Sequence, residues 1–168
     1  MNLLVIKGSP QKDGAATAIT NKLIDGAQDG GQTITQYDAG TDPVPTLTTD
    51  GDGNFLPDDE RLKKLLAELR AADIIVFSTP MYFFGMSAQM KAVVDHIMRW
   101  NEQLKTHKTG ILVAVAPVDN FDHIKSEFKA IFASLGWTFG GQVLAGKISD
   151  ADHLRFYPDL AYQLGKSL

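Results

Sequence analysis

The chain has 168 residues, of which 44% are hydrophobic, with 16 basic and 20 acidic residues and a formal net charge of −4. This length suits a single domain with one substantial core, and the negative balance argues against a nucleic-acid binder, whose surface is basic. The sequence contains no cysteine, which excludes disulfides, iron–sulfur ligation, thiolate metal sites and a cysteine nucleophile. No basic region precedes the first apolar run, and no run approaches the roughly 20 apolar residues of a membrane helix, so we expect a cytoplasmic protein without a membrane partner.

Apolar runs alternate with helical patterns from one end of the chain to the other. The predicted strands are residues 3–6, 33–37, 74–77, 110–116 and 139–145. The predicted helices carry an apolar stripe at helical spacing and cover residues 15–27, 59–71, 88–100, 121–135 and 158–167. Continuous apolar strands separated by helices indicate a parallel sheet with helices on both faces. The sequence therefore predicts an α/β fold, a doubly wound three-layer α/β/α sandwich formed as one domain over residues 1–168.

The loop after the first strand, Lys7 to Thr17, leads into the first helix and has the composition of an anion site. Free N–H groups and the helix dipole at such a turn attract phosphate, and Ser9 and Thr17 supply hydroxyl donors. The dinucleotide pattern G-x-G-x-x-G and the P-loop pattern G-x-x-x-x-G-K-[ST] are both absent, so a monophosphate fits better than a pyrophosphate or triphosphate. The alternative is a turn that is capped by its own polar residues.

Residues 39–58, after the second strand, form a long insertion rich in Gly, Pro, Thr and Asp. Loops of this length are commonly functional or mobile. A lid over the site of the same or a partner subunit is one interpretation, and an inert excursion is the other. At the other end of the chain, residues 147–168 form a C-terminal extension that ends in the last predicted helix.

The segment after the third strand, residues 78–87, is unusually apolar for a surface loop. Its large apolar residues are Met81, Tyr82, Phe83, Phe84 and Met86. A loop at the carboxyl end of a parallel strand is where open α/β sheets bind ligands. Pro80 is expected to lock φ, and Gly85 to permit a positive φ. Two interpretations remain open: a wall for a planar aromatic cofactor, or a loop buried under a neighbouring subunit.

The loops after the first and third predicted strands are more informative when they are considered together. In a five-stranded parallel sheet of order 2-1-3-4-5, strands one and three are neighbours at the switch point of the topology. A phosphate loop after strand one and an aromatic wall after strand three then line one crevice, and residues 116–120 after strand four would close its third side. This pairing suits a ligand with a phosphate at one end and a flat ring system at the other, as in FMN.

With these residues in view, the chain resembles the NAD(P)H-dependent FMN reductase branch of the flavodoxin-like superfamily, including its iron–sulfur flavoprotein type. Gly8-Ser9-Pro10 with Thr17 is similar to that family's G-S-P-x-x-x-G-x-T loop. Thr79-Pro80-Met81-Tyr82 with Ser87, Lys91 and Asp95 is similar to its T-P-x-Y…S-x-x-x-K-x-x-x-D segment. The resemblance covers most of residues 1–146. It implies noncovalent FMN, hydride acceptance at the flavin N5 from NAD(P)H, and a homodimer or homotetramer with the site near the subunit interface.

Three positions depart from the family pattern. Ala16 stands where the family often has Asn, so one hydrogen bond to the phosphate is expected to be missing. His96 stands where an Arg commonly follows the Asp. Residues 39–59 occupy the place where related members carry a cysteine cluster, and without cysteine an iron–sulfur cluster is excluded.

The predicted cofactor-binding residues come from the three loops. They are Ser9, Gln11, Lys12, Gly14, Ala15, Ala16, Thr17, Pro80, Met81, Tyr82, Phe83, Phe84, Gly85, Ala116, Pro117, Val118, Asp119 and Asn120. For Lys12 the alternative to cofactor binding is a solvated surface charge. For Asp119 and Asn120 the alternative is a cap of the following helix.

No catalytic acid or base is predicted, because flavin supplies the redox chemistry. No metal site is predicted either, since the four histidines show no metal spacing; His96 and the other three are expected at the surface or in caps. Trp100 is expected to contact an interface.

The function that follows is a two-step cycle. NAD(P)H first reduces FMN and leaves, and a small acceptor such as a quinone, free flavin or nitroaromatic then binds in place of the nicotinamide cofactor. One alternative is a flavodoxin-like FMN electron carrier that serves a protein partner. The other is a flavin-free α/β domain that acts as an interaction scaffold.

Overall fold

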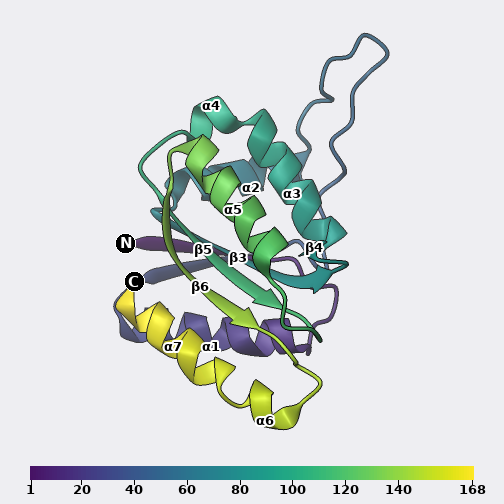
Figure 1. Ribbon diagram of the computed structural model, residues 1–168. Helices are drawn as coiled ribbons and strands as arrows, with labels where there is room; N and C mark the ends of the chain where they lie inside the picture. Colours follow the sequence, from purple (N-terminus) through teal and green to yellow (C-terminus); the bar gives the residue numbers. More distant parts are fainter.

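The computed structural model describes residues 1–168 and contains one five-stranded parallel sheet with a short antiparallel addition (Figure 1). The order is β2-β1-β3-β5-β6, which confirms the predicted 2-1-3-4-5 order once the added strand β4 is set aside. The parallel strands are β1 Asn2–Lys7, β2 Thr33–Asp38, β3 Ile74–Tyr82, β5 Thr109–Val115 and β6 Thr138–Ala145. The added strand, β4 Gly85–Met86, pairs antiparallel with the end of β3.

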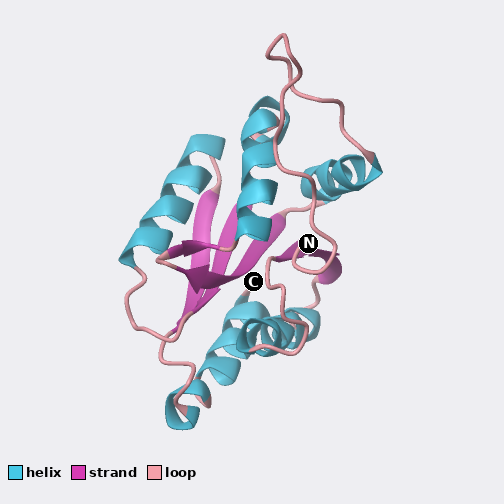
Figure 2. Cartoon of the chain, turned by 90° about the vertical axis from the view of Figure 1, so that its right-hand side faces the viewer, coloured by secondary structure: helices cyan, strands magenta, loops and turns pink.

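Helices cover both faces of this sheet (Figures 1 and 2). One face packs against α1 Ala15–Asp29 and α7 Tyr157–Ser167. The other packs against α2 Glu60–Ala71, α3 Ala88–Arg99 and α5 Asp122–Leu135. Two single turns, α4 Asn101–Leu104 and α6 Ala151–Leu154, complete the list, and α6 is an addition to the single C-terminal helix that was predicted. No helix of the fold combines the length and the apolar character needed to traverse a bilayer.

The strands are continuously apolar because successive side chains point to opposite faces and both faces are covered. In β3, Ile75 and Phe77 point toward α2, α3 and α5, whereas Ile74 and Val76 point toward α1 and α7. Phe77 is fully buried, and its ring centroid lies 5.4 Å from that of Phe128. The central strand therefore joins two hydrophobic cores and holds its carboxyl end firmly.

The long loop, residues 39–58, lies along α3 and then extends beyond the rest of the chain (Figures 1 and 2). Its first part is fixed by the Nε2 atom of His96, which donates to the carbonyl oxygen of Pro45 at 2.9 Å. Its last part is fixed by Asp58, which accepts from Arg99 at 2.8 Å and from the indole of Trp100 at 3.2 Å. Residues 48–57 between these contacts are exposed.

Two sequence predictions are wrong at this point. His96 was expected at the surface and Trp100 at an interface, but each is less than 4% exposed, and their rings stack with centroids 5.4 Å apart. The reason is that the two ends of the loop cover this end of α3. Met98 of the same helix is about half exposed.

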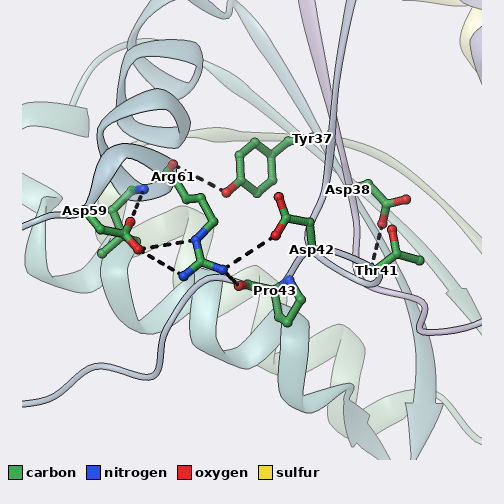
Figure 3. A network of polar contacts seen from close by, with 8 residues as sticks. Tyr37, Asp38, Thr41, Asp42, Pro43, Asp59 and Arg61 are labelled. Atoms are coloured by element: carbon green, nitrogen blue, oxygen red, sulfur yellow. Dashed lines mark hydrogen bonds and ion pairs between the residues drawn. The ribbon is translucent and has the colours of Figure 1, made fainter.

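Arg61, in the first turn of α2, connects the two ends of the long loop (Figure 3). Its guanidinium lies 3.1 Å from the carboxylate of Asp59 and 3.5 Å from that of Asp42, and it donates to the carbonyl oxygen of Pro43 at 3.0 Å. The phenol of Tyr37, at the end of β2, donates to the carbonyl oxygen of Arg61 at 3.4 Å. The network fixes the exit from β2 relative to the start of α2.

Replacing Tyr37 by phenylalanine is expected to reduce the amount by which the free energy of unfolding falls at alkaline pH. Burial, followed by the nearby Asp42 carboxylate, raises the pKa of Tyr37 from 10.0 to about 12. A raised folded-state pKa contributes stability that is complete below the unfolded value and is lost as pH rises toward the folded value. Wild-type stability should therefore fall across pH 10 to 12. Urea unfolding at each pH should show a smaller fall for Tyr37→Phe, and equal slopes for the two proteins would contradict the assignment.

Candidate functional site

A cavity of about 450 Å³ opens at the carboxyl edge of the sheet, within the roughly 300–1,000 Å³ of small-molecule sites. It is lined by the carboxyl ends of β3 and β5 and by the segments that follow β1, β3, β5 and β6, because the carboxyl ends of parallel strands meet at one edge. Its lining residues are Ser9, Gln11, Gly14, Ala15, Ala16, Pro80, Met81, Tyr82, Phe83, Val115, Pro117, Ile148 and Ser149.

The first turn of α1 presents free amide groups beside this cavity. The N–H of Ala18 donates to the carbonyl oxygen of Gly14 at 3.1 Å, whereas the amides of Ala15, Ala16 and Thr17 donate to no protein acceptor. No side chain caps the helix, and its first turn contains no acidic residue. Three free N–H groups at the positive end of a helix dipole form an anion site.

The side chains of the phosphate loop take different positions. Ser9 is buried and its Oγ accepts from the amide of Gln11 at 3.2 Å. Thr17 donates from Oγ1 to the carbonyl oxygen of Gln11 at 3.2 Å and does not line the cavity. Lys12 is exposed and does not line the cavity. The backbone of the loop, more than its charged side chain, therefore faces the cavity.

The end of β3, the two residues that follow it and β4 form a tight β-hairpin, where the sequence suggested a loop. Tyr82 pairs with Gly85, so only Phe83 and Phe84 form the turn. These two residues have φ of +45° and +69°, whereas Gly85, which was expected to need a positive φ, does not have one. The prediction for Gly85 is wrong because the turn residues are the two phenylalanines. Tyr82 and Phe83 line the cavity and Phe84 does not.

Two hydroxyl groups fix this hairpin to its neighbours. The amide of Ser87 donates to Oγ1 of Thr79 at 3.0 Å, across the base of the hairpin. The hydroxyl of Ser87 donates to the carbonyl oxygen of Gly8 at 2.6 Å and accepts from the amide of Met90 at 3.2 Å, which caps α3. One serine thus joins the phosphate loop, the hairpin and α3.

The loop after β5 contributes less than predicted. Pro117 lines the cavity, but Ala116, Val118, Asp119 and Asn120 do not. The Oδ1 atom of Asn120 accepts from the amide of Asp122, the first residue of α5, at 3.4 Å, although the N-cap residue itself is Phe121. Asp119 lies against the backbone of Gly146, since a Cβ on that glycine would be 2.7 Å from its Oδ1.

The sequence did not predict three residues of the lining. Val115 ends β5, and Ile148 and Ser149 follow β6. The only available signal was position, because a loop after the last parallel strand must open at the same edge as the others. No glycine or hydroxyl pattern marks Ile148 and Ser149.

The cavity gathers ten of the eighteen predicted cofactor-binding residues. The eight that lie outside its lining are Lys12, Thr17, Phe84, Gly85, Ala116, Val118, Asp119 and Asn120. None of the lining side chains is a carboxylate, histidine, lysine or arginine. The cavity therefore offers an anion site at one end and apolar surface at the other, and Tyr82 is the one lining residue whose side chain could exchange a proton in general acid–base catalysis.

A parallel sheet of this order, with a ligand cavity at the switch point between β1 and β3, defines a flavodoxin-like α/β protein. Over residues 1–155 the chain matches the model of a family that is described by its flavodoxin-like fold. The chain belongs to this family.

Two named proteins show the similarity in sequence. An FMN-dependent NADH:quinone oxidoreductase of Alcanivorax borkumensis is 36% identical over 117 residues, which cover 59% of this chain and 57% of that protein. The chain thus spans little more than half the length of that relative. The putative NAD(P)H-dependent FMN-containing oxidoreductase YwqN of Bacillus subtilis is 25% identical, and the match covers 96% of this chain and 93% of that protein.

Among solved structures, an FMN-dependent NADH-azoreductase of Bacillus anthracis in complex with FMN has a TM-score of 0.77. The match covers 99% of both chains at 16% sequence identity. This likeness shows the fold.

Proposed function

We propose that the protein is an FMN-dependent NAD(P)H oxidoreductase that passes hydride through bound FMN to a small acceptor such as a quinone, free flavin or nitroaromatic. The observation that carries the proposal is a single cavity that joins an uncapped helix N-terminus to an apolar wall and has no charged side chain in its lining. The names of the relatives in Alcanivorax borkumensis and Bacillus subtilis support the same chemistry.

The residues present fit FMN. A monophosphate can accept hydrogen bonds from the free amides of Ala15, Ala16 and Thr17, with the Ser9 hydroxyl beside them. The flat ring system can lie along Pro80 to Phe83, where the surface is apolar. FMN, when bound, supplies the capacity to accept hydride at N5 and to pass two electrons on.

The chain itself binds, orients and excludes water. The helix dipole and amides of α1 hold the phosphate end, and the hairpin holds the ring end at a fixed distance from it through Ser87. Val115, Pro117 and Ile148 limit the access of water on the remaining sides. The side chains of Thr17 and Lys12 can reach the phosphate only from outside the cavity lining, so the contribution of these two side chains is secondary in this proposal.

A cytoplasmic homodimer or homotetramer with the site near a subunit interface completes the proposal. The half-exposed Tyr82 and Phe84 and the exposed Phe83 supply apolar surface next to the cavity, and apolar aromatic surface is typical of such interfaces.

The visible absorption spectrum of the purified protein tests this function. The protein is soaked in FMN, desalted, and measured before and after anaerobic addition of NADH or NADPH. Retained flavin that bleaches quickly is the expected result. Retained flavin that resists bleaching would instead favour an electron carrier, and loss of all flavin on desalting would remove the cofactor from the proposal.

A further inference from the structure

The segment that follows β6, residues 146–149, borders the cavity on the side of the C-terminal extension. We propose that Ser149 in this segment hydrogen-bonds to an uncharged polar group of the bound flavin, and that Tyr157 of α7 is the residue that positions Ser149. The inference rests on the proposed function and extends its binding site to the C-terminal extension.

Ser149 has the free hydroxyl group that this role requires. It is exposed, it lines the cavity together with Ile148, and its hydroxyl donates to no acceptor in the chain. Apart from Ser9 in the phosphate loop, the polar side chains of the lining are those of Gln11, Tyr82 and Ser149. Ligand pockets that are mostly apolar orient their ligand through a few such groups, and Ser149 is the one that the segment after β6 supplies.

The backbone that leads to Ser149 is held in an unfavourable conformation. Lys147 has a φ of +53°, in the left-handed region that residues with a Cβ rarely adopt. The side chain of Lys147 is exposed, so its packing does not explain the conformation. Backbone strain of this kind persists where the surroundings hold the chain in place, and it is concentrated at ligand sites. The bend at Lys147 lies where the chain leaves β6 and passes to the two residues that line the cavity.

Hydrogen bonds on both sides of Lys147 hold this bend. The amide of Gly146 donates to the hydroxyl of Tyr157 at 3.2 Å, and the amide of Ile148 donates to the carbonyl oxygen of Ala116 at 3.3 Å. The segment is therefore fixed to the loop after β5 by a backbone contact and to α7 by a single phenol.

Tyr157 can act as an anchor because α7 is itself fixed. It is the first residue of α7, and its side chain packs against the core that α7 shares with α1 (Figure 1). The two helices are in backbone contact, since a Cβ on Gly26 of α1 would lie 2.0 Å from the carbonyl oxygen of Tyr162 of α7. The phenol of Tyr157 therefore connects the segment 146–149 to a rigid pair of helices.

Replacing Ser149 by alanine tests the contact by fluorescence titration with two ligands. These are FMN and riboflavin, which has the same ring and ribityl chain but no phosphate. The affinity for both ligands is expected to fall about fivefold, as the loss of one neutral hydrogen bond predicts. Ser149→Thr, which keeps a hydroxyl, should restore most of the affinity. A loss confined to FMN would place the hydroxyl on the phosphate and overturn the proposed contact.

Tyr157→Phe tests the positioning role in a double-mutant cycle. Alone, it should weaken the binding of both flavins about threefold. Combined with Ser149→Ala it should cause no further loss, because Tyr157 acts through Ser149. Additive losses would mean that Tyr157 affects binding by another route, and its positioning role would be wrong.

Tyr162→Phe is the matched control for the cycle. It removes a phenol hydroxyl from the same helix, but one that donates to Asp29 at 2.6 Å, at the end of α1. It should leave the affinity for both flavins unchanged.

Failure of this inference can be distinguished from failure of the proposed function. If Ser149→Ala binds both flavins as tightly as the wild type does, the inference is wrong, while FMN binding and NAD(P)H oxidation remain. If the wild-type protein binds neither flavin, the proposed function fails and the role of Ser149 fails with it.

Discussion

Replacing Ala15 by aspartate is expected to weaken FMN binding about a thousandfold. Ala15 is the first residue of α1, its amide donates to no protein acceptor, and its side chain lines the cavity. A carboxylate at this position would repel the negatively charged phosphate over a short distance. Two unit charges about 4 Å apart near a protein surface interact with about 4 kcal/mol, which corresponds to about three factors of ten in affinity.

The same substitution should leave the fold intact. An acidic residue in the first turn of a helix interacts favourably with the dipole, typically by about 0.3–1 kcal/mol, and the first turn of α1 has none. Thermal unfolding without FMN should therefore give an equal or higher midpoint. The prediction thus separates damage to the anion site from damage to the protein.

Ala15→Asn is the matched control, because asparagine has nearly the same shape as aspartate and no charge. Fluorescence titration of FMN should give Ala15→Asn an affinity much closer to wild type, and added salt should narrow the gap between the two variants. If Ala15→Asp keeps wild-type affinity, the phosphate does not bind at the start of α1 and the placement of FMN in this cavity is wrong.

Most of the fold could be predicted because its strands are buried on both faces. Runs such as 74–77 are continuously apolar and stand between helical stripes, so their number, type and order followed from a few rules about parallel sheets. The lengths of the strands were harder to predict than their number and order. β3 continues to Tyr82 because Pro80 and Met81 stay in register with β5 and β4 respectively, and that pairing depends on segments distant in sequence.

The cavity could be predicted only where local composition marks it. Gly14 and Ser9 stand in a recognisable phosphate loop, and the apolar segment at 80–83 stands out by its hydrophobicity. Ile148 and Ser149 carry no such mark, and the turn at Phe83 and Phe84 contradicts local preference. Positions where local preference and structure disagree are where function is expected to constrain the chain.

The errors at His96 and Trp100 have one physical cause. Their partners, Pro45 and Asp58, lie 51 and 42 residues away in the sequence. These partners belong to a loop with no periodic pattern, so nothing in the sequence places it against α3. Whether a histidine or tryptophan near the end of a helix is buried therefore depends on the segment that covers it. The sequence of the helix alone does not identify that segment.

Replacing Gly40 by alanine is expected to lower both stability and FMN affinity, although Gly40 lies outside the cavity lining. Its amide donates to the carbonyl oxygen of Lys7 at 2.9 Å, at the start of the phosphate loop. A Cβ on Gly40 would lie 1.8 Å from the carbonyl oxygen of Ser9. Both partners of this clash are fixed to the backbone, so no side-chain rotation relieves it and the two segments must separate.

Separation should cost about 1–3 kcal/mol of stability, as overpacking typically does. It should also displace Ser9, which lines the cavity together with Ala15 and Ala16, and losing a hydrogen bond from its hydroxyl to a charged phosphate would cost about 1.5–3 kcal/mol. FMN affinity should therefore fall at least about tenfold. Urea unfolding and fluorescence titration measure the two effects separately.

Gly51→Ala is the control within the same long loop, because a Cβ at Gly51 meets no atom within 4 Å. It should leave both quantities near wild type. If Gly40→Ala keeps the stability and the FMN affinity of the wild type, the long loop and the phosphate loop move independently. A joint loss would mean that the exit from β2 holds Ser9 in position, and that the insertion at 39–58 supports the site from behind while no residue of it lines the cavity.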